Sequence, residues 1–161
     1  MNVYELFSFK AFIYFTMAYS LEKGAESKSY VRWSMFTESP VEFIHNSSIG
    51  IHAVSAEGII LYANKCELEV LGYTEEEYVG HHVSEFQVDE HCLSDMLTRL
   101  GNLENLNNYP ARVQGKGSIK YIIYNSSVYE ENGEFKHTRC YGTEVDKIIY
   151  DVFLKHFKFS K

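Results

Sequence analysis

Two long runs of residues suited to extended structure, 118–129 and 134–145, are separated by a turn that contains Glu131-Asn132-Gly133. Glycine tolerates the backbone angles of a tight turn, so this pattern indicates a β-hairpin. A third such run, 109–114, precedes them and is closed by the turn Gly115-Lys116-Gly117. Three consecutive antiparallel strands are therefore predicted in the second half of the sequence.

A shorter strand pair comes earlier, at 49–54 and 59–63, with Ser55-Ala56-Glu57-Gly58 as its connection. The segments between the two groups of strands show helical spacing of apolar residues, most clearly in 89–100, which Asp89 caps. Two strands, several short helices and three strands make an α+β order. The sequence thus predicts a five-stranded antiparallel sheet with short helices on one face.

The segment G-Y-T-E-E-E-Y-V-G at 72–80 places three glutamates between two glycines. Thr74 and Glu77 have the spacing of a capping box, and acidic residues in a first helical turn match the helix dipole. Adjacent helix positions point in different directions, so these glutamates do not form a paired-carboxylate catalytic site. The segment is interpreted as a helix boundary, and Asn64 is placed to cap the helix before it.

The charge of the chain is unevenly distributed. The 161 residues carry a formal net charge of −7, and residues 41–110 hold twelve acidic side chains against Lys65 and Arg99. A negatively charged region repels a phosphate backbone. We therefore expect no nucleic-acid partner.

The three cysteines, Cys66, Cys92 and Cys140, are far apart, odd in number and without CxxC spacing. This pattern argues against a zinc site and against a disulfide framework, and it favours a reducing compartment. The sequence therefore predicts a cytoplasmic protein.

The first 40 residues differ from the rest. Residues 11–21 are uncharged, but eleven residues are too few to cross about 30 Å of hydrocarbon as a helix, so no membrane span is predicted. We expect residues 1–40 to form an N-terminal helical extension and connector. Its helix would pack on the domain or on a second subunit, which predicts a homodimer.

Three stretches in the predicted order resemble a known family. They are I-G-I-H-A-V-S-A-E-G-I-I-L-Y-A-N at 49–64, L-G-Y-T-E-E-E-Y-V-G at 71–80 and G-S-I-K-Y-I-I-Y-N-S-S-V-Y-E-E-N-G-E-F-K-H-T-R-C at 117–140. Together they resemble a PAS domain, a sensory module of bacterial signalling proteins, and they are similar to the subgroup that precedes sensor histidine kinases. The resemblance places the PAS domain at 41–146 and a C-terminal flanking helix or linker at 147–161.

The resemblance implies a small-molecule pocket between the inner face of the sheet and the helix at 89–100. The candidate ligand-pocket residues are His52, Val54, Met96, Leu97, Val113, Tyr121, Ile123, His137, Arg139 and Tyr141. It also implies that the signal leaves through the sheet or the flanking helices. The candidate structural or signalling residues are Asn64, Gly72, Thr74, Glu77, Gly80, Glu144 and Asp146, the last two standing where the family's exit motif D-I-T is expected.

The polar pocket candidates allow two interpretations. Strand alternation groups His52 with Val54, and His137 with Arg139 and Tyr141. If these faces line the pocket, the side chains would bind a polar or anionic ligand, and Arg139 would clamp a carboxylate. Alternatively, the histidines are exposed sheet positions or satisfied core residues.

No cofactor is identified from the sequence. The region around Cys92 lacks the N-C-R-F-L-Q type run of the flavin photosensors, and His91 lacks the neighbours of a haem ligand in the haem-sensing subgroup. We therefore expect neither flavin nor haem. His81-His82 supplies too few ligands for a metal site.

The function predicted from the resemblance is a non-catalytic sensory module that binds a small ligand or a partner and relays a conformational change to an output domain. Two alternatives remain open. One is a ligand-free module for protein interaction and dimerisation, whose cavity is filled by aromatic side chains: Tyr121, Tyr124, Phe135 and Tyr141. The other is the sensor fragment of a two-component histidine kinase, with the kinase or another effector outside this sequence.

Overall fold

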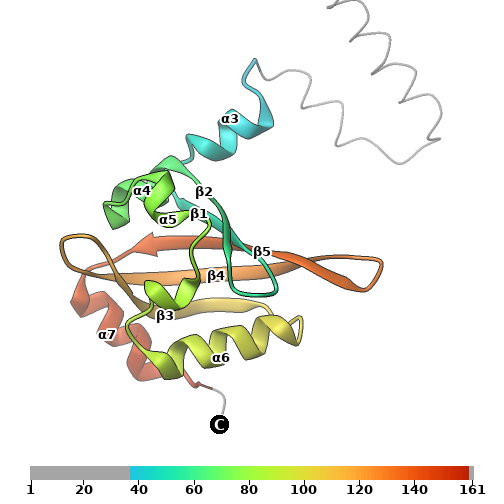
Figure 1. The fold of residues 1–161 in the computed structure, drawn as a ribbon. Coiled ribbons are helices and arrows are strands. Elements are labelled where there is room, and N and C mark those ends of the chain that lie inside the picture. The colour runs from blue at the N-terminus through green and yellow to red at the C-terminus, as the bar shows by residue number, and fades with distance from the viewer. Residues whose placement is uncertain (1–36, 160–161) are drawn as a thin grey trace, which may run out of the picture. The chain divides into compact units, whose positions relative to one another are not determined.

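Five strands form one antiparallel sheet in the order β2-β1-β5-β4-β3 (Figure 1). They are β1 (Gly50–Val54), β2 (Ile60–Ala63), β3 (Leu106–Gln114), β4 (Ile119–Glu131) and β5 (Glu134–Glu144). The last strand in the sequence, β5, lies in the middle and pairs with both β1 and β4. The α+β sheet predicted from the sequence is therefore confirmed.

The computed structural model describes residues 37–159. From Pro40 onward the described chain forms one compact unit. The predicted N-terminal helix, and the dimer expected to form through it, lie outside the described residues. Within residues 37–159, no helix has the length and apolar character needed to cross a membrane.

The turn between β4 and β5 shows why the sequence pattern identified this hairpin. Asn132 and Gly133 both have positive φ angles, 56° and 77°. Two consecutive residues with positive φ favour a tight turn that matches the twist of the two strands, and asparagine and glycine adopt such angles most readily. Figure 1 shows the resulting hairpin extending beyond the other strands.

Strand β3 begins at Leu106, three residues earlier than the sequence indicated. The pairing with β4 is irregular between Leu106 and Tyr109, and Asn108 has a φ of 51°. A bulge interrupts the regular pairing of two strands. Here it contains polar residues, which are also typical of loops. The strand therefore begins among polar residues that lie before the predicted run 109–114.

Short helices connect and flank the strands. They are α3 (Pro40–His45), α4 (Lys65–Leu71), α5 (Glu75–Tyr78), the 3-10 turn η1 (Val83–Glu85), α6 (Glu90–Gly101) and α7 (Lys147–His156). The capping box is present, because the Thr74 backbone N–H donates to Glu77 Oε2 at 3.0 Å. Gly72 and Gly80 have φ angles of 79° and 89°, as helix-terminating glycines require.

Asn64 joins three elements at the edge of the sheet. Its Oδ1 accepts hydrogen bonds from the backbone N–H groups of Glu67 (3.0 Å) and Ile51 (2.9 Å). Its Nδ2 donates to the carbonyl groups of Ile44 (3.2 Å) and Ile49 (2.9 Å). Asn64 is thus more than the predicted cap of α4, since it also fixes the end of α3 and the start of β1.

The two faces of the sheet have different coverings. The face that we call inner carries the buried side chains of Ala111, Ile122 and Tyr124 and belongs to the hydrophobic core. On the opposite face, which we call outer, the Tyr121 ring packs against Tyr150 of α7 with their centroids 5.1 Å apart. The cavity described below therefore lies on the inner side, away from α7.

Candidate functional site

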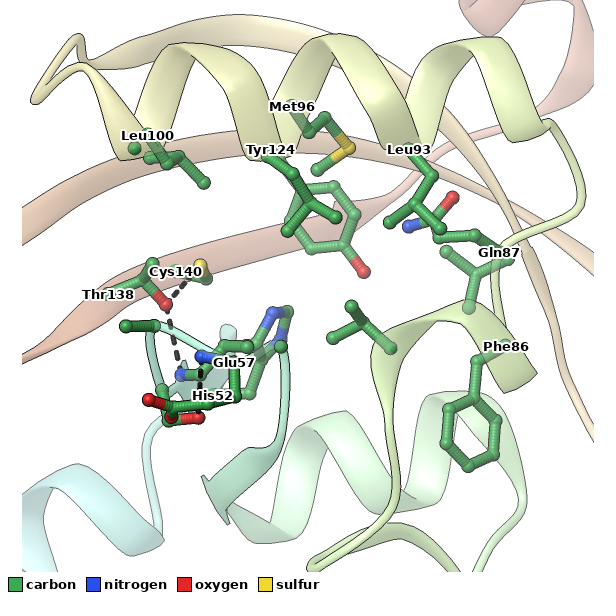
Figure 2. A pocket seen from close by; sticks show the side chains of 18 of the residues that line it. His52, Glu57, Phe86, Gln87, Leu93, Met96, Leu100, Tyr124, Thr138 and Cys140 are labelled. Atoms are coloured by element: carbon green, nitrogen blue, oxygen red, sulfur yellow. Dashed lines mark hydrogen bonds between the residues drawn. The ribbon is translucent and has the colours of Figure 1, made fainter.

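A cavity of about 300 Å³ lies between the inner face of the sheet and helix α6. Its apolar wall comes mainly from one face of α6. Figure 2 shows Leu93, Met96 and Leu100 pointing from the helix toward Tyr124 on the sheet. These residues recur every three or four positions, which is the spacing that places side chains on one helix face.

The opposite wall is polar at its centre. His52 lies in β1 and is 8% exposed, and its Nδ1 lies 2.8 Å from Oε1 of Glu67 in α4. Glu67 is only 2% exposed, so this is a buried contact between two ionisable groups. Tyr78 adds a hydrogen bond from its hydroxyl to the same carboxylate oxygen, at 3.4 Å.

Gly50 provides the space for this carboxylate. A Cβ atom at position 50 would lie 2.3 Å from Glu67 Oε2 and 3.0 Å from the carbonyl oxygen of Gly142. Both distances are shorter than normal non-bonded contacts. Glycine at this position therefore lets a helix glutamate reach beneath the sheet and meet His52.

Cys140 and Thr138 of β5 lie beside His52. In the register of β1 and β5, His52 and Cys140 are direct partners. The Thr138 hydroxyl oxygen accepts a hydrogen bond from the Val54 backbone N–H at 3.0 Å and lies 3.2 Å from Cys140 Sγ (Figure 2). The polar wall thus combines an imidazole, a carboxylate, a hydroxyl and a thiol.

The electrostatics of this wall favour a charged histidine. Burial lowers the pKa of His52, but the charges of Cys140 and Glu67 and their hydrogen bonds raise it, and the pKa rises from 6.5 to about 10. Burial raises the pKa of Cys140, yet the nearby His52 cation and the Thr138 hydroxyl lower it below its ordinary value of 9.0. An imidazolium between a carboxylate and a thiol explains both directions.

Five of the ten pocket candidates line this cavity. They are His52, Val54, Met96, Leu97 and Val113. His52 is paired with Glu67, as a satisfied core histidine would be, and it also borders the cavity.

The other five candidates do not reach the cavity. Tyr121, Ile123, His137, Arg139 and Tyr141 occupy the odd-numbered, outer positions of β4 and β5, whereas Tyr124, Thr138 and Cys140 occupy the inner ones. The expectation that they line the pocket is corrected, because a shift of one residue along a strand changes the face. Tyr121 instead packs under α7, and the Arg139 guanidinium lies 4.9 Å from the centre of the Tyr129 ring.

The sequence prediction missed several residues of the polar wall. Glu67, Tyr78, Gln87, Thr138 and Cys140 were not among the pocket candidates. Strand alternation already grouped Thr138 with Cys140, so a different choice of the inner face of β5 would have found both. Glu67 left no such signal, because a glutamate in a short helix normally faces solvent.

The histidines considered as metal or haem ligands lie elsewhere. His81 contacts Glu85, His82 contacts Ser84, and the ring of His91 packs against Phe159. Within residues 37–159, no group of three or more histidine, cysteine, aspartate or glutamate side chains is arranged to hold a metal ion.

The candidate exit residues lie at the end of β5 and the start of α7. Glu144 accepts a hydrogen bond from Lys120 Nζ at 3.0 Å, which ties the ends of β4 and β5 together. Asp146 occupies the N-cap position of α7, and its carbonyl accepts from the Tyr150 backbone N–H at 3.0 Å. Both residues therefore stand between the sheet and the flanking helix.

Solved structures with this architecture come from several signalling proteins. The PAS domain of an HTR-like protein from Haloarcula marismortui has a TM-score of 0.58 and 21% identity, and the match covers 74% of this chain and 100% of that one. A light-oxygen-voltage domain has a TM-score of 0.63 and 16% identity over 74% of this chain and 93% of that one. A PAS domain from a two-component sensor histidine kinase has a TM-score of 0.57 and 15% identity, and the match covers 73% of this chain and 100% of that one.

No curated protein sequence matches the chain significantly. The family model described as the PAS fold matches residues 38–140, which is more than half of the sequence. This range contains the whole of β1 to β4, most of β5 and every residue that lines the cavity. The chain therefore belongs to the PAS family.

Proposed function

We propose that this PAS domain is a sensory module that binds a small, mainly apolar molecule in the cavity between the sheet and α6. The observation that carries this proposal is the cavity itself, about 300 Å³ with an apolar helix on one side and His52, Thr138 and Cys140 on the other. Ligand sites in proteins typically have about 300–1,000 Å³ and few polar groups in an apolar lining. The volume therefore suits a small molecule.

The polar groups suggest where such a ligand is anchored. The Oε1 atom of Gln87 is buried at the cavity and has no hydrogen-bond partner among the described residues. An unpaired buried acceptor favours a partner that donates a hydrogen bond. We therefore propose a ligand with one hydroxyl or amide donor near Gln87 and an apolar body against Leu93 and Met96.

Helix α6 offers a route from the cavity to the C-terminal segment. On its side away from the cavity, Asp95 Oδ2 accepts hydrogen bonds from Tyr109 Oη at 2.9 Å and from Arg99 Nε at 3.0 Å. Arg99 also donates to the carbonyl of Lys158 at 3.1 Å. We propose that a ligand that displaces α6 changes the packing of the segment after α7, which shifts the population between two arrangements.

Native mass spectrometry and thermal unfolding with a panel of small phenols, alcohols and amides test this function. We expect the protein to retain at least one compound and to unfold at a higher temperature with it. Amide protection at residues 157–159 should change at the same time. If no compound binds, the sensory proposal is overturned.

A matched pair of variants locates the binding. Leu93→Phe fills part of the cavity and should abolish the ligand-dependent rise in unfolding temperature. Thr98→Phe adds an aromatic ring to the exposed side of the same helix and should leave the rise unchanged. Equal effects of the two substitutions would place the ligand outside the cavity.

The second candidate function is a dimerising interaction module. Ile148 and Val152 of α7 are 79% and 56% exposed, which is unusual for large apolar side chains on one helix. PAS domains often dimerise, so a second copy of this chain is the partner that we propose for this surface. Sedimentation of Ile148→Glu tests it: the variant should be a monomer under conditions in which the unchanged chain is a dimer.

The output and the location are also proposals. A PAS domain of a two-component sensor histidine kinase is among the structural relatives, so we propose a kinase as the output partner. Cys66, Cys92 and Cys140 are all free thiols, which supports a reducing, cytoplasmic environment.

A further inference from the structure

Three neighbouring strands place Ser126, Cys140 and His52 in one row across the inner face of the sheet. Ser126 and Cys140 are direct partners between β4 and β5, and Cys140 and His52 are direct partners between β5 and β1. Side chains at direct partner positions lie about 4.5–5.5 Å apart at their Cβ atoms. The thiol is thus held between a hydroxyl and an imidazole, and it borders the cavity.

The hydrogen bonds around this row favour a thiolate. Glu67 Oε1 lies 2.8 Å from Nδ1 of His52, so the other ring nitrogen remains for Cys140, the direct partner of His52 across β1 and β5. The Cys140 thiol donates to the Thr138 hydroxyl oxygen at 3.2 Å, and once the sulfur has lost its proton the same hydroxyl can donate to it. A cation and hydrogen-bond donors next to a cysteine are what lower a thiol pKa.

The same chain contains a matched cysteine without this arrangement. Cys92 is 4% exposed and Cys140 is 3% exposed, and each borders a cavity. The Cys92 sulfur donates to the carbonyl oxygen of Pro110 at 3.7 Å, and burial raises the pKa of Cys92 to about 11. The two cysteines differ in their neighbours and hardly at all in their burial.

We propose that Cys140 is a nucleophile that captures small α,β-unsaturated carbonyl compounds in the cavity, with Glu67-bound His52 as the cation that holds the thiolate and supplies a proton. In this addition, the sulfur lone pair forms an S–C bond with the β-carbon and the C=C π bond breaks. The resulting enolate takes a proton from His52 at its α-carbon, and solvent returns a proton to His52. No group leaves and no oxidant is needed.

The shape and lining of the cavity select this class of electrophile. Leu93, Met96 and Leu100 form an apolar wall opposite the thiol, which favours a compact organic molecule over a fully hydrated one such as hydrogen peroxide. Cys140 borders the same cavity and supplies the nucleophile, so the site combines space for an apolar molecule with a reactive centre. The product is a PAS domain whose cavity holds a molecule covalently attached to Cys140.

The test uses the full chain and methyl vinyl ketone as the probe, at limiting concentration and pH 7. Intact-mass spectrometry should show the gain of one whole probe molecule, and peptide mapping should place it at Cys140. We expect Cys140 to react at least about tenfold faster than Cys92, because the thiolate is the reactive form. Equal rates at the two buried cysteines, or preference for Cys92, would overturn the proposal.

The pH profile separates a reactive thiolate from mere access to the cavity. The rate at Cys140 should reach its plateau with a midpoint below 9.0, and His52→Gln should move that midpoint above 9.0, since burial alone raises a thiol pKa. Circular dichroism and thermal unfolding verify that the variant is folded. If His52→Gln does not fold, the pH dependence of the Cys140 rate in the unchanged chain is the test. A midpoint above 9.0 there rejects the proposal.

This inference rests on the proposed function only in that it uses the same cavity. Different experimental results would reject the covalent reaction and the proposed sensory function. Reversible ligands that bind in native mass spectrometry while Cys140 stays unmodified would reject the covalent reaction and leave the sensory module intact. Modification of Cys140 with no reversible ligand retained would reject the proposed reversible sensing and leave the covalent reaction supported.

Discussion

The two faces of β5 place their side chains in very different surroundings. The inner positions Thr138 and Cys140 are 3% exposed and meet the buried pair of His52 and Glu67. The outer positions include Arg139, whose cation lies over the exposed side of Tyr129. A basic group lies at each face, His52 of β1 at the inner one and Arg139 at the outer one, so the presence of a basic group does not distinguish the two faces.

The difference between the faces lies in what burial demands. A buried charge is costly unless a partner of opposite charge and further hydrogen bonds compensate it. On the inner face, Glu67 is such a partner for His52, and the Tyr78 hydroxyl donates a further hydrogen bond to Glu67. On the outer face, water compensates Arg139, so its neighbours are not required. The inner arrangement should therefore respond strongly to substitution and pH, and the outer one weakly.

Glu67→Gln should give the largest effect. It removes the charge partner of buried His52, and breaking a buried ion pair by changing one partner typically costs about 3–5 kcal/mol. We expect the free energy of unfolding, measured by urea denaturation at pH 7, to fall by about that amount.

Glu69→Gln is the matched control for this substitution. Glu69 lies two residues further along α4, its side chain is 66% exposed, and it pairs with Lys65 at 3.7 Å. An exposed pair of this kind contributes less than about 1 kcal/mol. If both glutamine variants lost the same stability, burial would not be what distinguishes the two glutamates.

Raising the pH should weaken the same buried pair. The pKa of His52 is about 10 in the folded chain against 6.5 as its ordinary value. A raised pKa stabilises the folded state fully below pH 6.5, and this contribution is lost progressively as the pH rises to about 10. The lowered pKa of Cys140 acts in the opposite sense, so the net loss is smaller than the shift of His52 alone would give.

Urea denaturation between pH 6 and 10, compared for the unchanged chain and His52→Gln, measures this loss. The difference between their free energies of unfolding should shrink steadily with pH. A difference that stays constant would mean that His52 does not titrate in this range.

The fold was predictable from local signals, whereas the polar wall was not. The Asn132-Gly133 turn, the capping box at Thr74 and Asn64 each act through nearby backbone groups, so their patterns are visible in the sequence. Alternation in β5 grouped His137 with Arg139 correctly, but it does not say which group faces inward. That choice depends on what packs against each face.

Glu67 illustrates a second limit. It meets His52 fifteen residues away only because Gly50 leaves room for its carboxylate and β1 lies beside α4. Neither condition produces a periodic pattern in the sequence. A burial of this kind depends on a tertiary contact, which helix spacing alone does not reveal.

Thr138→Val should have an intermediate effect on the inner face. The substitution keeps the shape of the side chain but removes the oxygen that accepts from the Val54 backbone N–H. An unsatisfied buried backbone group costs about 1–3 kcal/mol, which urea denaturation resolves. Thr143→Val, at an exposed outer position of the same strand, should change stability by less than about 0.5 kcal/mol.

Arg139→Ala should have the smallest effect, and it tests the outer face directly. The cation–π contact with Tyr129 at 4.9 Å is exposed, and such contacts contribute about 0.5–1 kcal/mol. Because Arg139 points away from the cavity, the substitution should change neither the binding of small ligands nor the rate of Cys140 modification. A loss of ligand binding in Arg139→Ala, with stability nearly unchanged, would restore the carboxylate clamp expected from the sequence. It would also mean that the outer face holds the binding site. The inner cavity would then be a structural feature of the core, and the contrast between the two faces of β5 would be reversed.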